Sequence, residues 1–183
     1  MRIIAGEFRG RRLASIGGGR RQSLRPTSDR VRESLFSILA GHMVLNGARV
    51  LDVFAGTGAL GLEALSRGAK SAVFVDNGKS ARDLLKRNIS ICDADGRARI
   101  LDRDAIRPGI NNGAPYNLMF MDPPYGRGLG EAALKAAVSG GWISEHAVIA
   151  WEEGVNVEIP SSFGIIDERR YGSTQIKILE YGA

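Results

Sequence analysis

The tetrapeptide Asp122-Pro123-Pro124-Tyr125 directly follows an apolar stretch that is typical of a buried strand. An aspartate and the carbonyl of a ring-locked proline can accept two hydrogen bonds from one amino group. Such acceptors would localise the lone pair of an aryl amine, which is otherwise delocalised into its ring. Tyr125 offers a ring on which a base can stack, a task that phenylalanine would perform equally well. The motif therefore predicts methyl transfer to a base amine without prior deprotonation.

A glycine loop, Gly56-Thr57-Gly58-Ala59-Leu60-Gly61, follows an earlier apolar strand, and Asp76 lies twenty positions after Gly56. Glycines let a ligand approach the backbone closely, and an acid at this spacing can bind ribose hydroxyls. The pattern suits NAD as well as S-adenosylmethionine, so the loop alone leaves both cofactors open. A nicotinamide-dependent dehydrogenase would leave the Asp122–Tyr125 motif unexplained. The two motifs together favour S-adenosylmethionine.

These motifs fall at the ends of strands in an alternating pattern of strands and helices. Apolar strands that alternate with helices imply a parallel sheet covered on both faces. The last two strands are joined by a short turn and must be antiparallel. Ligands of such sheets bind beyond the carboxyl ends of the strands. The expected strands are 49–54, 71–75, 98–101, 117–121, 147–151, 164–170 and 175–181, and the expected helices are 28–43, 60–66, 79–91 and 128–139.

Positive charge is concentrated near the N-terminus. The 183-residue chain has a formal net charge of +5, yet residues 1–32 hold nine arginines against two acids, a balance of +7. Clustered arginines attract phosphates by releasing their counterions, so we expect a nucleic acid to dock here. Residues 2–13 are expected to form a small hairpin, and 16–23 a glycine-rich loop.

Other residues suggest no chemistry of their own. Cys92 is the only cysteine, so neither an intrachain disulfide nor a thiolate metal cluster can form. His42 and His146 have no partner at metal-ligand spacing, and Glu152 and Glu153 have the pattern of a solvated strand end. No apolar run reaches the length of a membrane span, and the first residues lack a signal-peptide core. A cytoplasmic protein is expected.

The sequence resembles the bacterial small-subunit ribosomal RNA guanine-N2 methyltransferases of the RsmD family over nearly its whole length. The glycine loop and the Asp-Pro-Pro-Tyr motif are generic to amino-methyltransferases, whereas the two N-terminal segments, 2–13 and 25–36, are much more specific. The segments that carry the resemblance are 2–13 (RIIAGEFRGRRL), 25–36 (RPTSDRVRESLF), 51–69 (LDVFAGTGALGLEALSRGA), 121–125 (MDPPY) and 171–174 (YGST).

The resemblance implies an α/β architecture, the Rossmann-like class I S-adenosylmethionine-dependent methyltransferase fold. This fold has a seven-stranded, mostly parallel sheet with one antiparallel strand, here with a small N-terminal β-hairpin extension. Residues 1–24 are expected to be a basic RNA-binding extension and 25–183 the methyltransferase domain. The implied contacts to the cofactor S-adenosyl-L-methionine are Asp52, Phe54, Gly56, Thr57, Gly58, Asp76, Asn77, Asp104, Ala105, Arg25 and Thr27. Arg25 could equally bind an RNA phosphate.

The implied reaction is methylation of the exocyclic N2 amine of one guanosine in small-subunit (16S) ribosomal RNA. The catalytic residues would be Asp122, Pro123, Pro124 and Tyr125, with no metal, and the partner would be this RNA in an assembled or partly assembled 30S particle. A DNA adenine-N6 methyltransferase and a non-catalytic RNA-binding assembly factor remain alternatives. The expected RNA contacts are Arg2, Arg9, Arg11, Arg12, Arg20, Arg21 and Arg127.

Overall fold

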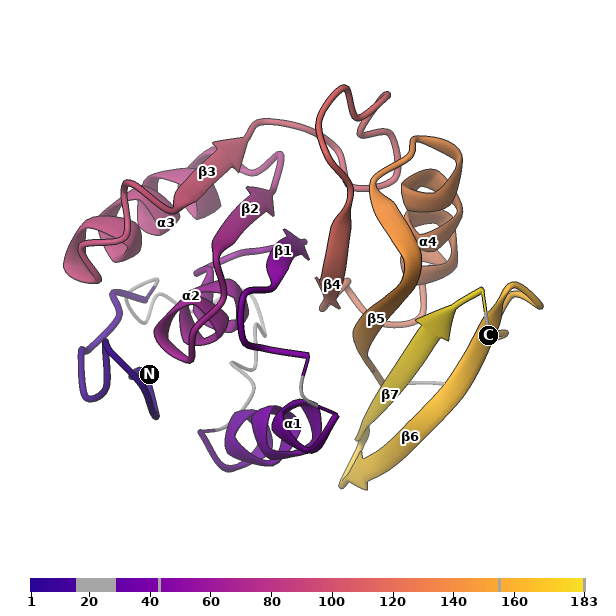
Figure 1. The fold of residues 1–183 in the computed structure, drawn as a ribbon, viewed down its shortest axis with the longest axis horizontal. Coiled ribbons are helices and arrows are strands. Elements are labelled where there is room, and N and C mark those ends of the chain that lie inside the picture. The colour runs from indigo at the N-terminus through magenta and orange to yellow at the C-terminus, as the bar shows by residue number, and fades with distance from the viewer. Residues whose placement is uncertain (16–28, 43, 155, 183) are drawn as a thin grey trace.

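The computed structural model describes residues 1–15, 29–42, 44–154 and 156–182 (Figure 1). The expected elements are confirmed, and their ends agree within two residues except at β5. That strand begins earlier because it pairs with Tyr116 before a shift in register, a pairing that the apolar run alone did not reveal. The elements are α1 (Asp29–Gly41), β1 (Arg49–Val53), α2 (Ala59–Ser66), β2 (Ser71–Val75), α3 (Lys79–Ile91), β3 (Ala98–Leu101), β4 (Tyr116–Met121), α4 (Leu129–Ser139), β5 (Ile143–Glu153), β6 (Phe163–Tyr171) and β7 (Thr174–Tyr181).

The strands form one seven-stranded sheet in the order β3-β2-β1-β4-β5-β7-β6. Strand β1 pairs in parallel with both β2 and β4, and β4 pairs in parallel with β5. Strand β7 is antiparallel to both β5 and β6, so it is the single reversed strand. The chain order reverses between β1 and β4, the place where sheets of this kind bind their ligands. The fold class expected from the sequence is confirmed.

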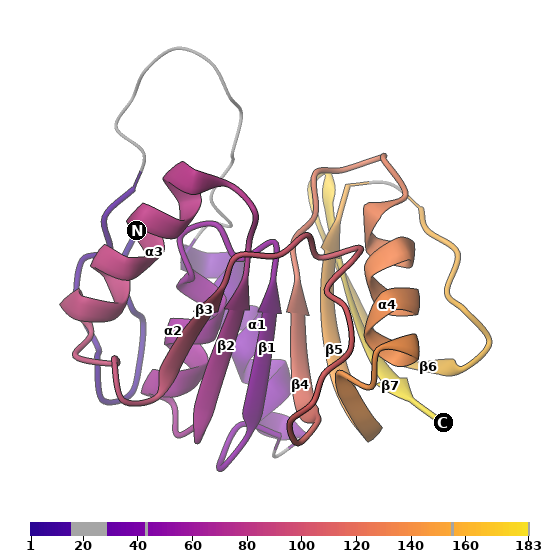
Figure 2. The same ribbon diagram turned by 90° about the horizontal axis from the view of Figure 1, so that it is seen from above.

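The two faces of the sheet carry different helices (Figure 2). Helices α1, α2 and α3 pack on one face, where the core includes Phe36, Phe74 and Phe120. Helix α4 covers the other face, where Met119 and Trp151 are buried. Because successive side chains of a strand point to opposite faces, the even-numbered residues from Leu118 in β4 and from Val148 in β5 face α1–α3.

Residues 1–15 form a turn-rich hairpin that packs on α2 and α3. Its strands meet at one antiparallel bridge between Arg2 and Arg12, as the expected hairpin requires. Ile3, Phe8 and Leu13 are buried in the same core as the three helices. The hairpin is therefore part of the core, and its assignment as a separate RNA-binding extension stays a prediction.

Glu63 on α2 anchors this hairpin from within the protein. Its fully buried carboxylate accepts hydrogen bonds from the backbone N–H groups of Ile4, at 2.7 Å, and Ala5, at 3.0 Å. The same carboxylate pairs with Nε of Arg67 at 2.7 Å. A buried charge is tolerated only when paired and hydrogen-bonded in this way. The acid thus fixes the start of the chain to α2.

We predict that Glu63→Ala lowers the free energy of unfolding by about 3 kcal/mol, because backbone donors and the Arg67 guanidinium lose their acceptor. Urea denaturation followed by circular dichroism measures this change. The matched control is Glu33→Ala, which removes an exposed acid from α1 and should cost less than about 0.5 kcal/mol. Equal losses in the two variants would contradict the anchoring role.

Candidate functional site

The register of the central strands brings three acids to one edge of the sheet. Val53 pairs with Met121, and Met121 pairs with Trp151, so β1 and β4 end level with each other and β5 continues two residues farther, to Glu153. Asp52 and Glu152 lie in β1 and β5 on the face that α1–α3 cover, and Asp122 directly follows β4. The carboxyl edge of the sheet therefore concentrates carboxyl groups at the switch in strand order.

Asp52 is a buried carboxylate that caps α2. Its Oδ2 accepts a hydrogen bond from the Gly61 N–H at 2.9 Å, a first-turn donor that has no partner within the helix. A Cβ at Gly61 would overlap the ring of Phe74 and reach to 3.0 Å from this oxygen, so only glycine fits. Burial is the largest cause that raises the pKa of Asp52 to about 8. The hydrogen bond from Gly61 lowers this pKa, and the negative charge of Asp76 makes a smaller contribution that raises it.

Asp76 ties the loops that follow β1 and β2 together. Its Oδ2 accepts from the Gly56 N–H at 2.9 Å, and its Oδ1 accepts from the Gly78 N–H at 2.8 Å. Phe54 and Gly56 both have positive φ values, 56° and 54°, so the chain turns sharply beyond β1. Carboxylate oxygens have about four acceptor sites together, so Asp76 can still accept further donors such as ribose hydroxyls.

The expected cofactor contacts among the described residues also include Asp104, which follows β3. Asp104 is half-buried, and its Oδ1 accepts from the backbone N–H of Ile106 at 3.1 Å. Arg25 and Thr27 lie outside the described residues. The roles of Arg25 and Thr27 stay predictions. So do the roles of the remaining expected contacts, which are the half-buried Thr57, the buried Gly58 and Ala105, and the exposed Asn77.

Asp122 is half-buried just beyond β4, between the buried Met121 and Pro123. Burial raises the pKa of Asp122 well above its ordinary range, and the carboxylates of Glu152, Asp52 and Glu153 raise it further. The charged form becomes favourable when a cation or several hydrogen-bond donors reach the group. This behaviour suits an acceptor for a substrate amine.

The structure corrects the interpretation of Glu152 and Glu153 as a solvated strand end. Their exposed fractions are only 6% and 3%. The reason is that β7 extends alongside β5 to this edge, where Glu152 pairs with Ile176 and Glu153 with Gln175. Aligning the ends of the expected strands, with β7 reversed beside β5, would have placed both acids next to Asp122.

Both acids hold the segment around Tyr125. The Tyr125 hydroxyl donates to Glu152 Oε1 at 2.8 Å. Glu153 Oε1 accepts from the backbone N–H groups of Gly126, at 3.3 Å, and Gly154, at 2.8 Å. Tyr125 itself is 41% exposed, so its ring has accessible surface on which a base can stack.

The expected RNA-contacting arginines lie in different environments. Arg11 is engaged within the protein: its Nη1 donates to the Ile91 carbonyl at 2.8 Å, pairs with Asp93 at 2.7 Å, and its guanidinium lies 5.3 Å from the Phe8 ring centre. Arg2 pairs with Asp29 at 3.6 Å. Three others, Arg9, Arg12 and Arg127, are exposed, whereas Arg20 and Arg21 lie outside the described residues.

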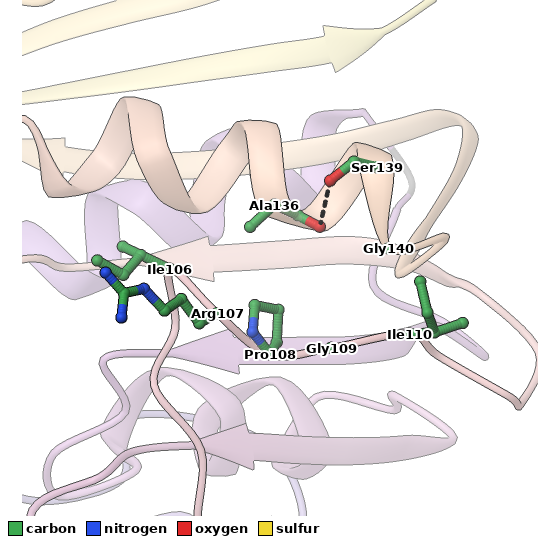
Figure 3. Close-up of a pocket in the computed structure, with 8 residues that line it drawn as sticks. All are labelled: Ile106, Arg107, Pro108, Gly109, Ile110, Ala136, Ser139 and Gly140. Atoms are coloured by element: carbon green, nitrogen blue, oxygen red, sulfur yellow. Dashed lines mark hydrogen bonds between the residues drawn. The ribbon is translucent and has the colours of Figure 1, made fainter.

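Away from this edge, the structure has a cavity of about 210 Å³ between residues 106–110 and the end of α4 (Figure 3). Its lining includes Arg107, Ser139 and the exposed Ile110, but none of the expected site residues. Within the described ranges, no group of three or more His, Cys, Asp or Glu side chains could hold a metal ion. No helix in those ranges is both long and apolar enough to cross a membrane.

Comparisons with known proteins give a consistent picture. The chain matches, over residues 1–180, the model of a family described as conserved hypothetical protein 95. It is 40% identical over 161 residues to Ribosomal RNA small subunit methyltransferase D of Escherichia coli strain K12, covering 88% of this chain and 78% of that protein. The Haemophilus influenzae protein of the same name is 31% identical over 188 residues, covering 98% and 93%. The solved structure of Escherichia coli yhhF is 38% identical, with a TM-score of 0.86 and coverage of 100% and 98%.

We predict that the unfolding free energy falls as the pH rises from about 4 to about 8. Over this range the folded protein keeps a proton on Asp52, whose pKa is about 8, while the unfolded chain has released it. Asp52→Asn keeps an oxygen for the Gly61 N–H and removes the buried charge. It should therefore stabilise the protein above pH 8 by about 1 kcal/mol or more and flatten the pH dependence.

Thermal and urea unfolding at several pH values measure both effects. Asp95→Asn, which neutralises an exposed acid, is the matched control and should leave the profile unchanged. A pH profile of Asp52→Asn that coincides with that of the parent protein would argue against a desolvated carboxyl at this position.

Proposed function

The chain belongs to the family described as conserved hypothetical protein 95, and we propose that it is an S-adenosylmethionine-dependent methyltransferase acting on the N2 amine of a guanosine in small-subunit ribosomal RNA. The observation that carries the proposal is the position of Asp122–Tyr125 at the carboxyl end of β4, beside the glycine loop that follows β1. Two relatives that carry the name Ribosomal RNA small subunit methyltransferase D support the same substrate class.

The residues at this edge fit S-adenosylmethionine. A Cβ on Gly58 or Gly61 would overlap Leu85 or Phe74, so these glycines let the loop pack tightly on the core. A Cβ on Gly56 would meet only the Phe54 carbonyl at 3.9 Å, so this position is open to a ligand, and Asp76 offers oxygens to ribose hydroxyls. The raised pKa values of Asp52 and Asp122 favour a cationic ligand, because positive charge offsets the desolvation of a carboxylate. When bound, S-adenosylmethionine supplies an electrophilic methyl group.

The Asp122–Tyr125 motif receives the amine to be methylated. Asp122 and the Pro123 carbonyl accept hydrogen bonds from its two N–H groups and so localise the nitrogen lone pair. Tyr125 stacks on the base. No base needs to act before attack. The methylated amine carries an extra proton, and Asp122, whose pKa is raised by burial, is suited to accept it. The protein thus contributes orientation and electrostatic stabilisation.

The guanine-N2 specificity and the 30S particle are the finer parts of the proposal. They are supported by the resemblance of residues 2–13 and 25–36 to the RsmD family and by the exposed cations Arg9, Arg12 and Arg127, which can reach phosphates. A DNA adenine-N6 methyltransferase shares the chemistry of the motif. Transfer of labelled methyl groups to small-subunit RNA or to adenine-containing duplex DNA separates the two activities.

We predict that a strain lacking this gene loses one N2-methylguanosine from small-subunit RNA, as mapped by mass spectrometry, and that the wild-type gene restores it. Asp122→Ala should lower turnover by about 10²-fold or more, because an acceptor aimed at the reacting amine is removed. Calorimetric binding of S-adenosylhomocysteine should change little. The control Asp95→Ala should restore the modification fully, and near-normal turnover of Asp122→Ala would remove Asp122 from the mechanism.

We predict that replacing Arg9 and Arg12 together with Ala weakens RNA binding to a similar extent across sequences. The salt dependence of binding should flatten by about 0.7 to 0.9 log units for each phosphate that the variant no longer binds. RNA titrations at several salt concentrations measure this slope. Arg11→Ala is the informative comparison: it should lower the melting temperature, since it breaks the interactions with Ile91 and Asp93. An unchanged slope in the double variant would make these cations solvated bystanders.

A further inference from the structure

The hydroxyl of Tyr125 is held by a buried acid. It donates to Glu152 Oε1 at 2.8 Å. Because Glu152 is only 6% exposed, protein atoms rather than water surround its carboxylate and hold it in place. A hydrogen bond to a charged acceptor contributes more than one between neutral groups. A ring needed only for its face would not require this partner. The hydrogen bond gives the hydroxyl a partner that the sequence does not reveal, and it bears directly on the prediction that phenylalanine would serve equally well at this position.

Gly154 supports the ring of Tyr125 directly. A Cβ placed on Gly154 would overlap Cδ2 of the ring and come within 3.0 Å of Cε2 and Cγ. Its own N–H is bound by Glu153 at 2.8 Å, so the backbone at this position is fixed. The ring rests against this backbone, which limits the positions that it can adopt.

The hydroxyl also interacts with the side chain of Thr174, which follows the turn between β6 and β7. Burial raises the pKa of the Tyr125 phenol, the Thr174 side chain lowers it as a hydrogen-bond donor, and Glu152 raises it. Thr174 begins β7 and pairs with Tyr171, the last residue of β6. The Tyr171 hydroxyl in turn bonds to Ser34 on α1. The Tyr-Gly-Ser-Thr motif therefore links α1 to the tyrosine of Asp122–Tyr125.

We propose that Glu152, Gly154 and Thr174 are positioning residues that hold Tyr125 as a fixed platform for the target base. This proposal rests on the proposed function. A base must reach the site with its amine at Asp122, and an error of about 1 Å in placement can cost about 10²-fold in rate. A platform fixed before the base arrives removes the need to order the ring during binding.

The first experiment compares four variants by steady-state methylation of small-subunit RNA. Tyr125→Phe, Glu152→Ala, Gly154→Ala and Thr174→Val should each lower kcat about tenfold, because the ring loses a hydrogen bond or its seat. The KM for S-adenosylmethionine should stay constant. Glu152→Gln and Thr174→Ser keep an acceptor and a hydroxyl, so they should restore kcat to within about threefold of the parent. Retention of the parent kcat by Tyr125→Phe would overturn the proposal.

A double-mutant cycle shows whether Glu152 acts through the tyrosine. In the Tyr125→Phe background, Glu152→Ala and Thr174→Val should have no further effect on kcat, since the hydroxyl that they hold is already absent. Fully additive losses would mean that the acid contacts the base itself or serves only stability, and either result would overturn the proposal. If Glu152→Ala fails to fold, the cycle of Tyr125→Phe with Thr174→Val, at a half-buried position, provides the test instead.

Two controls account for effects of substitution alone. Glu145→Ala removes an exposed acid from β5, and Gly96→Ala adds a methyl group where a Cβ would meet no other atom within 4 Å. Both should keep the parent kcat. A parent protein that methylates no RNA would refute the proposed function, whereas an active parent with active Tyr125→Phe would refute only the positioning of the ring.

Discussion

The register of β1, β4 and β5 at the carboxyl edge of the sheet imposes the constraint on which the rest of the site depends. Neighbouring strands lie about 4.8 Å apart, so acids at the ends of adjacent strands share one small volume. Burial and mutual repulsion raise the pKa values of Asp52 and Asp122. The Gly61 N–H in the first turn of α2 offsets part of the cost of burying Asp52. Protonation of the acids offsets more of that cost. Burying these acids lowers the free energy of unfolding of the empty protein, and a bound cation would offset part of that loss. The same side chains therefore lower stability and favour a cationic ligand.

Helix α2 connects this edge to the start of the chain. Its first turn caps Asp52, and farther along, Glu63 binds the backbone of the hairpin formed by residues 1–15. The exposed arginines of that hairpin are thereby fixed relative to the acids that surround the methyl-transfer site. Phosphates bound at Arg9 or Arg12 would set where the rest of an RNA enters. Helix α2 thus contacts both the basic hairpin, through Glu63, and the buried Asp52 at the carboxyl edge of the sheet.

The sequence predicts the sheet well because each central strand is a continuous apolar run that needs no distant partner to be recognised. The site edge follows from the same pattern, since Asp52, Asp76 and Asp122 stand at strand ends. What the sequence does not reveal depends on residues far apart in the chain. Arg11 contributes to the basic count, but its guanidinium pairs with Asp93, which lies 82 positions away. Glu152 and Glu153 look solvated until β7 covers them, and no local pattern encodes that pairing.

The reversed direction of β7 explains how a short turn comes to serve the base. In a parallel strand the last residues reach the carboxyl edge, and a long crossover must follow. Because β7 runs the other way, its first residue, Thr174, lies at that edge, directly after the tight turn that Gly172 makes with a φ of 63°. A hairpin turn is short and stiff, so a hydroxyl placed on it is held with little loss of entropy on binding. In the proposed function, the ends of β1 to β3 would present the cofactor while β4, β5 and β7 would orient the base. The backbone pairing of β7 with β5 and β6 would then hold the substrate side in place, which a crossover loop could not do.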